Sequence, residues 1–496
     1  MPGITIRWNI KKEINHDYNN IEYYANSVLH ALSSIAYDKG YRQEILLIDH
    51  SCVVACNRYP NYPVKIFNDD NFWICIEGRI YGKEDRIVKK ELSELLDYVF
   101  SDYVDDMYIV KGNRNNKLVN WLLKTDGDFI IYALDRKNMD LIIINDILGR
   151  LPLYYYYDNH LGLIISREIQ FAANLIEYNN GKSDKFDRMA VAQFLLCGYT
   201  LGKRTLLRDV YRMEPGSIIR LYNYNKEINI DNVYYFNFED KEYANENVDT
   251  SASKLVSLFN EACKNRANLD TAKKNILSLS GGFDSRCILV SLSKNKIPCS
   301  AVTVARPSWS PIVGNKSETE IAQILANKFG AEWESYPSPI QPTSEDLCKL
   351  LESKQGLSYI GYSFLLPFLY MIRENHTATI TFFTGHGGDA ALPDLTPTIK
   401  LHNLDDLINY IISRPTANVS LPLCEVASAV GIDKSQIVAE IKKILSSYPE
   451  KSLEQKYVHF LIYERVFNWF FEGEDRDRFY FWSVAPFYSI PSFILL

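Results

Sequence analysis

The chain has 496 residues, 47% hydrophobic and 23% charged, with a net charge of −7; this is typical of a globular protein of two or three domains and excludes a disordered chain. No basic cluster accompanies this acidic balance, so we expect no nucleic-acid partner. The nine cysteines form no C-x-x-C pair and no segment is typical of a membrane span, so we expect a reduced, cytoplasmic protein without a membrane partner.

The first half is rich in strand signals. Short β-branched or aromatic runs, separated by turn residues such as Gly127 and Gly149, predict strands at residues 72–76, 129–133, 141–144, 153–157 and 161–165. We interpret the tyrosine run 154–157 as a strand whose rings pack on both faces. These signals predict a largely β, α+β domain over residues 1–235.

A polar, acidic segment at residues 236–250 is typical of a linker. Helix and strand patterns alternate after it: a helix at 251–263, a strand ending near Leu279, a helical run from Cys287, a strand at 300–304, a helix at 318–329 ended by Gly330, and strands at 332–336 and 379–384. Such alternation predicts a parallel sheet covered by helices, with ligands at the carboxyl ends of its strands.

Residues 277–286, Leu-Ser-Leu-Ser-Gly-Gly-Phe-Asp-Ser-Arg, join a predicted strand to a predicted helix. Two glycines let the backbone approach a ligand, and amides at a helix N-terminus favour phosphate. No lysine follows the glycines, unlike in the phosphate loop of kinases and GTPases. The alternative is an ordinary strand–turn–helix junction with Asp284 as a helix cap.

A second glycine-rich turn, Thr384-Gly-His-Gly-Gly-Asp389, follows the strand pattern at 379–383. Asp284 and Asp389 would therefore lie at the same edge of the predicted sheet. Two carboxylates there suit one Mg²⁺ ion, completed by phosphate oxygens and water. Alone, the second turn could equally be an ordinary one.

Several motifs in order resemble known families. Ser-Gly-Gly-Phe-Asp-Ser at 280–285 resembles the pyrophosphate loop of the N-type ATP pyrophosphatases, which split ATP between the α and β phosphates. Thr384 to Asp389 resembles the Ser-Gly-Glu-Gly-Ala-Asp segment of the asparagine synthetase family. In the first half, Glu77-Gly-Arg-Ile-Tyr81 is similar to the family's Asn-Gly-Glu-Ile-Tyr, and residues 146–155 are similar to its Asp-x-x-Gly-x-x-Pro-Leu-Tyr-Tyr. The resemblance covers nearly the whole chain.

The resemblance implies a class II glutamine amidotransferase-like domain with an Ntn-hydrolase-like β sandwich at 1–235. It implies an asparagine synthase-like ATP-pyrophosphatase domain, α/β and adenine nucleotide α-hydrolase-like, at 251–496. ATP and Mg²⁺ would be the cofactors, with Asp284 and Asp389 on the metal. The implied nucleotide-binding positions are Leu279, Ser280, Gly281, Gly282, Phe283, Asp284, Ser285, Val304, Thr384 and Gly385.

Pro2 departs from the family. Glutamine-hydrolysing members begin Met-Cys-Gly-Ile, and the cysteine is the nucleophile that releases ammonia. Proline has no thiol, so we expect this chemistry to be absent and the domain at 1–235 to be a degenerate scaffold. Cys52, the first cysteine, lies in a strand-like run and is interpreted as a core residue.

His386 also departs from the family. Asparagine synthetases have Glu at this position and β-lactam synthetases have Tyr, whereas Gly-His-Gly-Gly-Asp resembles the lasso peptide cyclases, which join a peptide's N-terminal amine to an Asp or Glu side chain. Histidine titrates near neutrality and can take a proton from an attacking amine. The alternative is a loop histidine that only hydrogen-bonds the backbone.

The C-terminal segment differs as well. Residues 477–487 resemble the family's Asp-Arg…Val-Pro-Phe stretch, after which relatives carry a lysine that meets the adenylate and pyrophosphate. No lysine occurs here after Lys456. We expect either a shortened C-terminus or a substitute cation among Arg286, Arg476 and Arg478.

Together these features predict an ATP-dependent amide synthetase that adenylates a carboxylate and releases AMP and pyrophosphate on amine attack. The favoured substrate is a precursor peptide closed to a lasso macrolactam, and a leader-peptide protease would be its partner. Two alternatives stay open: an asparagine synthetase-type amidating ligase using free ammonia or a small amine, and a non-catalytic scaffold derived from the family.

Overall fold

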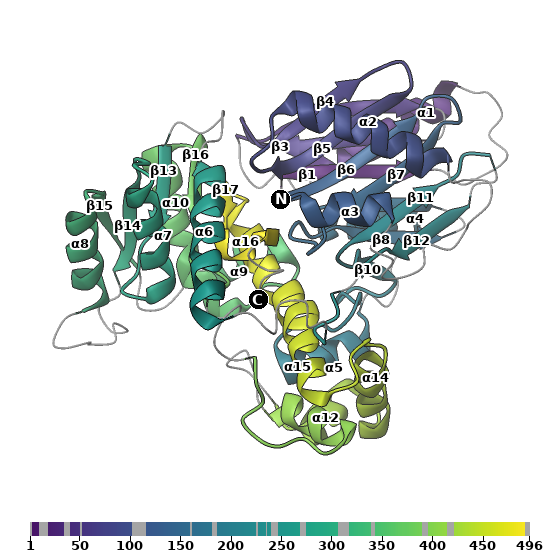
Figure 1. Ribbon diagram of the computed structural model, residues 1–496. Helices are drawn as coiled ribbons and strands as arrows, with labels where there is room; N and C mark the ends of the chain where they lie inside the picture. Colours follow the sequence, from purple (N-terminus) through teal and green to yellow (C-terminus); the bar gives the residue numbers. More distant parts are fainter. Residues whose placement is uncertain are drawn as a thin grey trace. The chain divides into compact units, whose positions relative to one another are not determined.

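The contacts divide the chain into two compact units (Figure 1). Unit 1 comprises Met1–Phe238 and Lys400–Phe471, and unit 2 comprises Glu239–Ile399 and Glu472–Leu496. The structure, a computed structural model, describes residues 2–8, 18–33, 40–49, 52–101, 116–158, 161–180, 186–224, 227–234, 236–239, 247–267, 274–305, 317–338, 343–388, 395–413 and 421–491.

Unit 1 contains two six-stranded sheets in which neighbouring strands run antiparallel. The first has the order β10 (Val210–Arg212), β8 (Tyr154–Asp158), β9 (Gly162–Ser166), β1 (Gly3–Trp8), β3 (Cys52–Arg58) and β2 (Arg42–Asp49). The second has the order β12 (Ile228–Asn232), β11 (Ser217–Leu221), β7 (Asp140–Asn145), β6 (Gly127–Asp135), β5 (Phe72–Ile80) and β4 (Val64–Asn68). All five strands predicted in this half are confirmed.

Helices cover both sheets of unit 1. The helices α1 (Tyr18–Ser33) and α4 (Ile169–Asn180) pack on the first sheet. The helices α2 (Asp85–Ser101) and α3 (Lys117–Lys124) pack on the second, through Phe100 against Phe72 and Trp121 against Phe129. Every residue of β6 and β7 is therefore buried. Cys52 is a core residue, as its strand-like context predicted.

The helical segment of unit 1 comprises α5 (Arg188–Cys197), α12 (Leu404–Ser413), α13 (Leu423–Val430), α14 (Lys434–Ser446), α15 (Leu453–Phe460) and the π-helical η2 (Leu461–Phe470). The sequence placed residues 400–471 in the second domain, whereas their contacts join them to unit 1. Leu421 donates its amide hydrogen to the Leu195 carbonyl, and Arg204 pairs with Glu440 at 3.0 Å. These contacts link segments more than two hundred residues apart, which sequence patterns do not reveal.

Unit 2 is built on a five-stranded sheet with the order β15 (Glu332–Pro337), β14 (Ser300–Ala305), β13 (Lys274–Ser278), β16 (Ile380–Phe383) and β17 (Trp482–Val484). All neighbouring strands are parallel, which confirms the predicted sheet type. Strand β17 was not predicted. In chain order the sheet grows from β13 towards β15, and then from β13 towards β17. The direction of winding therefore reverses between β13 and β16.

Helices precede, connect and follow these strands. They are α6 (Val248–Ala267), α7 (Phe283–Lys294), α8 (Glu318–Phe329), α9 (Ser344–Lys354), the 3₁₀ turn η1 (Ile360–Phe364), α10 (Leu365–His376), α16 (Phe471–Asp477) and the 3₁₀ turn η3 (Pro486–Tyr488). In Figure 1, α6, α7 and α8 lie along one face of the sheet. Helix α8 has the predicted bounds; a Ser317–Glu320 capping box starts it and Gly330, with φ of 72°, ends it.

The predicted linker at 236–250 is described only at its two ends. Residues 240–246 lie outside the described residues, and α6 begins at Val248, inside the predicted range.

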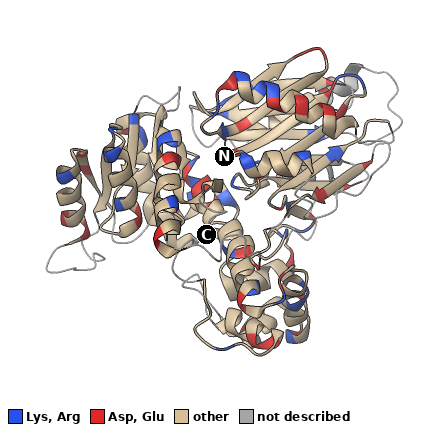
Figure 2. Ribbon diagram, viewed as in Figure 1, with Lys and Arg blue, Asp and Glu red and all other residues tan. Residues whose placement is uncertain are grey.

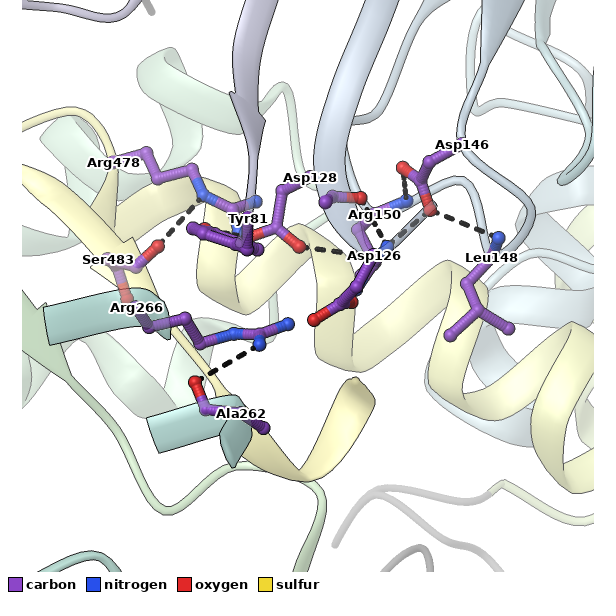
Figure 3. A network of polar contacts seen from close by, with 11 residues as sticks. Tyr81, Asp126, Asp128, Asp146, Leu148, Arg150, Ala262, Arg266, Arg478 and Ser483 are labelled. Atoms are coloured by element: carbon purple, nitrogen blue, oxygen red, sulfur yellow. Dashed lines mark hydrogen bonds and ion pairs between the residues drawn. The ribbon is translucent and has the colours of Figure 1, made fainter. Parts of the chain in front are cut away.

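Arg150 is the centre of a buried ionic cluster in unit 1 (Figure 3). Its guanidinium lies 3.0 Å from Asp146, 3.1 Å from Asp128 and 3.2 Å from Asp126. Burial disfavours the charged guanidinium, but Asp146 and Asp128 outweigh this and raise the pKa of Arg150. Asp146 also accepts the backbone amides of Leu148 and Arg150, and so fixes the turn between β7 and β8.

Acidic and basic residues are interspersed along the outer helices of both units (Figure 2). Within the described ranges, no helix is both long and apolar enough to cross a membrane. All nine cysteines carry free thiols.

We expect Arg150→Met to lower the free energy of unfolding by about 3–5 kcal/mol, because it leaves buried carboxylates without their cation. Urea unfolding measures this change. Lys65→Met is the matched control: it breaks the partly exposed pair of Lys65 with Asp85 and should cost at most about 1 kcal/mol. Equal shifts for the two variants would contradict the role of the cluster.

Candidate functional site

The first glycine-rich loop leaves the carboxyl end of β13 and enters α7 directly. Leu279 anchors it, because its amide donates to the Val302 carbonyl at 2.9 Å and its carbonyl accepts the Thr303 hydroxyl at 2.8 Å. The loop is closed by hydroxyls: the Ser280 amide donates to Ser285 Oγ at 3.0 Å, and the Gly282 amide donates to Ser280 Oγ at 3.1 Å. The two serines thus set the shape of the turn.

The N-terminus of α7 has no side-chain cap within the described chain. Gly282 is the N-cap residue, and Asp284 lies inside the first turn of the helix. The alternative in which Asp284 caps this helix is therefore wrong. An uncapped helix N-terminus behind two glycines keeps the local geometry that suits a phosphate group.

The second loop lies against the first. Because β13 and β16 are parallel neighbours, their carboxyl ends bring residues 280–285 and 384–388 together. A Cβ at Gly388 would collide with the Asp284 carboxylate, and one at Gly385 would lie 3.0 Å from the Ser285 amide nitrogen. Only glycine allows this approach, which explains the spacing of glycines in the second motif.

His386 is paired with an acid that the sequence did not single out. Its Nδ1 lies 2.6 Å from Oε1 of Glu474 on α16, and about a third of the imidazole (35%) stays exposed. The Glu474 carboxylate is buried and also accepts the hydroxyls of Thr384, at 2.5 Å, and Ser483, at 2.7 Å. Glu474 thus ties the second loop to α16 and to strand β17.

The pair shifts the pKa values of both partners. Burial lowers the pKa of His386, but the attraction of Glu474 outweighs it, so that the net pKa is raised. Burial raises the pKa of Glu474, but His386 outweighs it and holds that pKa well below the usual range. The imidazole therefore holds a proton more strongly than an isolated histidine does.

The three predicted substitute cations lie in two places. Arg286 is in the first turn of α7, where it donates to the Gly281 carbonyl at 3.0 Å. Arg476 and Arg478 are buried around α16: Arg476 pairs with Asp477 at 2.8 Å, and Arg478 donates to the Ser483 carbonyl at 3.3 Å. Among the described residues, Arg286 is the one of these three that donates a hydrogen bond to the backbone of the first loop.

Lys354 adds a further buried cation. Its ammonium lies 2.5 Å from Glu472 and 2.9 Å from Asp475, both on α16. Burial lowers the pKa of Lys354, but the two acids raise it by more than burial lowers it. The net pKa is raised, and the ammonium stays charged. The pairing fixes α16, and with it Glu474, against the end of α9.

The remaining predicted residues have separate outcomes. Leu279 is buried, and Val304 lies near the carboxyl end of β14, next to β13. Phe283 is exposed beside the loop, with the Arg286 guanidinium 4.9 Å from its ring centroid. Asp389, the second predicted metal ligand, lies outside the described residues. Nucleotide contacts at all these positions stay predictions.

The N-terminal part of unit 1 holds the buried carboxyl group of Glu77 beside the start of β1. Glu77 accepts the Ile4 amide at 3.0 Å, the Tyr62 hydroxyl at 2.5 Å and Arg167 Nε at 2.9 Å. Burial raises the pKa of Glu77. The charge of Arg167 lowers it by less than burial raises it, so the net pKa is raised. A Cβ at Gly3 would lie 2.5 Å from Arg167 side-chain carbons and 2.9 Å from Glu77 Oε1. Glu77 and Arg167 therefore pack directly against the start of β1.

Sequence reasoning missed Glu474, Lys354 and the Glu77–Arg167 pair. A signal for the first existed: four acids at 472, 474, 475 and 477 lie between strongly apolar segments, and buried acids require partners. Their partners lie on distant segments, so no local pattern could name them.

A comparison with known protein families matches part of the first half of the chain. Residues 52–235 match the family described as "Glutamine amidotransferase domain". This confirms an amidotransferase-like domain in unit 1. No curated protein sequence matches the chain.

Solved structures give weak likenesses. The glutamine phosphoribosylpyrophosphate amidotransferase from B. subtilis, complexed with ADP and GMP, is 10% identical, with 91% of this chain and 94% of that chain covered and a TM-score of 0.25. NMN synthetase from Francisella tularensis is 15% identical, over 45% of this chain and 95% of that one, with a TM-score of 0.23. The U34-tRNA thiolase NcsA from Methanococcus maripaludis, with its [4Fe-4S] cluster, is 15% identical, with 47% of this chain and 84% of that chain covered and a TM-score of 0.23. Similarities this low carry no argument about function.

We expect Pro2→Cys to release no glutamate from glutamine, even when Met1 is removed. Restoring a thiol does not remove the buried Glu77–Arg167 pair that packs against the start of β1. A glutaminase assay on the purified variant measures this, with a glutamine-hydrolysing amidotransferase as positive control. Glutamate formation by Pro2→Cys would show that a working pocket survives beside this pair.

Proposed function

We propose that this protein is an ATP-dependent amide synthetase that adenylates a carboxylate and transfers the acyl group to an amine. The observation that carries the proposal is the meeting of two glycine-rich loops at the reversal point of a parallel sheet, with Asp284 and His386 on opposite loops. Ligands of open α/β sheets bind outside the carboxyl ends of the strands at such a point.

The first loop would bind the phosphates of ATP. The start of α7 has no side-chain cap, and Arg286 adds positive charge beside Gly281. An oxygen of the substrate carboxylate attacks the α-phosphorus of ATP. The bond between the α-phosphorus and the oxygen that bridges it to the β-phosphate breaks, and pyrophosphate leaves. Donors fixed by the fold stabilise this leaving group without reorganisation.

Mg²⁺ fits the residues present. Asp284 supplies a hard carboxylate oxygen at the loop, and Mg²⁺ in nucleotide sites needs only one or two protein carboxylates. When bound, the ion would neutralise phosphate charge; Asp389 is the proposed second ligand.

His386 would serve the second half-reaction. The amine nitrogen attacks the acyl carbon, the bond to AMP breaks, and the amine proton passes to neutral imidazole. Glu474 orients the ring through Nδ1 and stabilises the imidazolium that forms. Because Glu474 is itself held by Thr384 and Ser483, the ring is preorganised rather than free to rotate.

For the substrate, we propose a precursor peptide closed to a lasso macrolactam. Pro2 lacks the thiol that would supply ammonia, and the Gly-His-Gly-Gly sequence at 385–388 resembles that of the lasso peptide cyclases. A protease that removes the leader would then act before this protein.

Asp284→Asn and His386→Ala should separate the two half-reactions. We expect Asp284→Asn to lower substrate-dependent ATP–pyrophosphate exchange at least about 100-fold, since it weakens charge stabilisation at the phosphates. His386→Ala should keep exchange but lower formation of a peptide product lighter by one water about 100- to 10,000-fold. Radiolabel exchange and mass spectrometry measure the two.

No ATP binding and no exchange with any carboxylate would overturn the synthetase proposal. Exchange without a dehydrated peptide, combined with amidation of a small amine, would overturn only the cyclase assignment.

The rate of amide formation should depend on pH through His386. Neutral imidazole accepts the proton, so the rate falls as pH drops below the pKa of His386. Because the pKa of His386 is raised, we expect the acidic limb of the pH–rate profile to have its midpoint above about 6.5, the usual pKa of histidine. Glu474→Gln removes the attraction that raises it, so the limb should move to lower pH. Glu374→Gln, exposed on α10, is the control and should leave the limb in place. An unshifted limb in Glu474→Gln would exclude His386 as the titrating base.

A further inference from the structure

Unit 1 contains a pocket of about 640 Å³ that none of the preceding chemistry uses. Its lining comes from β8 and β10 at one end of the first sheet and from β11 and β12 at one end of the second. All lining residues belong to the part of the chain that matches the amidotransferase family. The volume lies within the range of about 300–1,000 Å³ that is typical of ligand pockets.

One wall of the pocket is aromatic. Tyr155 on β8 pairs with Tyr211 on β10, with ring centroids 5.7 Å apart, and Tyr157 is 47% exposed. The ammonium of Lys203 already lies 5.1 Å from the Tyr211 ring centroid. A cation from the chain itself thus occupies the attractive face of one ring.

The remaining walls combine acidic and apolar groups. Among the described lining residues, Asp209, Glu214 and Glu227 are acidic and Lys203 is the one base, so their formal charge is three negative against one positive, or −2. Ile228 and Ile230 alternate along β12 and line the same side of the pocket. An apolar stem ending in a positive charge matches this lining better than an anion does.

We propose that this pocket binds the arginine or lysine side chain of an extended peptide. Tyrosine rings stack on the planar guanidinium, the carboxylates pair with it, and the isoleucines cover its stem. In the described chain β12 is the outermost strand of its sheet, so an extended backbone can add beside it. The choice of a peptide rather than a free amine rests on the proposed function, whereas the preference for a cation rests on the pocket alone.

The test is fluorescence anisotropy of the full chain with a fluorescein-labelled Thr-Thr-Arg-Thr-Thr peptide, without ATP. We expect binding at least about tenfold tighter than that of the same peptide with neutral citrulline in place of arginine. Tyr157→Ala and Glu227→Gln should each weaken binding about three- to tenfold. Tyr224→Ala is the matched control, because Tyr224 is 95% exposed and does not line the pocket.

Four outcomes would overturn the inference. Equal binding of the arginine and citrulline peptides, or tighter binding of a glutamate peptide, would exclude a cation site. Equal losses in Tyr157→Ala and Tyr224→Ala would place the binding elsewhere. Competition by N-acetyl-arginine amide at the same concentration as the peptide would exclude the extended peptide in favour of a free cationic molecule.

The test separates this inference from the proposed function. Asp284→Asn should bind the arginine peptide as tightly as the unchanged protein does, since Asp284 is not part of the pocket. Binding of the arginine peptide without any adenylation would support the cation pocket and overturn the synthetase proposal. Adenylation without binding of the arginine peptide would support the synthetase proposal and overturn the cation pocket.

Discussion

The parallel pairing of β13 with β16 is the constraint on which the candidate site depends. Chain winding reverses between these two strands, so the loops that follow them emerge side by side without a helix between them. The approach is so close that a side chain at Gly388 would collide with Asp284. Asp284 and His386, far apart in sequence, come to the same edge of one sheet for this reason.

Glu474 extends that arrangement beyond the two loops. A buried carboxylate is costly unless it is paired and hydrogen-bonded, and this one has His386, Thr384 and Ser483 as partners. The neighbouring acids of α16 are neutralised by Lys354 and Arg476. The buried charges around α16 therefore lie close together, and removing one partner takes a compensating charge away from another.

In unit 1 the residues that carry the family resemblance have structural roles. Asp146 neutralises Arg150 and fixes the turn after β7, while Glu77 is buried with Arg167 beside the first strand. These interactions stabilise the amidotransferase-like fold whether or not a nucleophile follows Met1. The domain fold therefore does not require a thiol at position 2.

The sequence alone predicted five strands of unit 1, the strands β13 to β16 of the parallel sheet and the glycine-rich loop after β13, because hydrophobic periodicity and glycine spacing are local properties. Helix α8 shows this best, since its cap, its apolar face and its terminal glycine are all adjacent in the chain. Only the tertiary structure decided that residues 400–471 join unit 1, that Glu474 pairs with His386, and that the tyrosines of β8 and β10 open onto a pocket. Each of these depends on contacts between segments that are distant in the sequence. No local sequence pattern specifies which buried charges pair with each other or which strands lie beside each other.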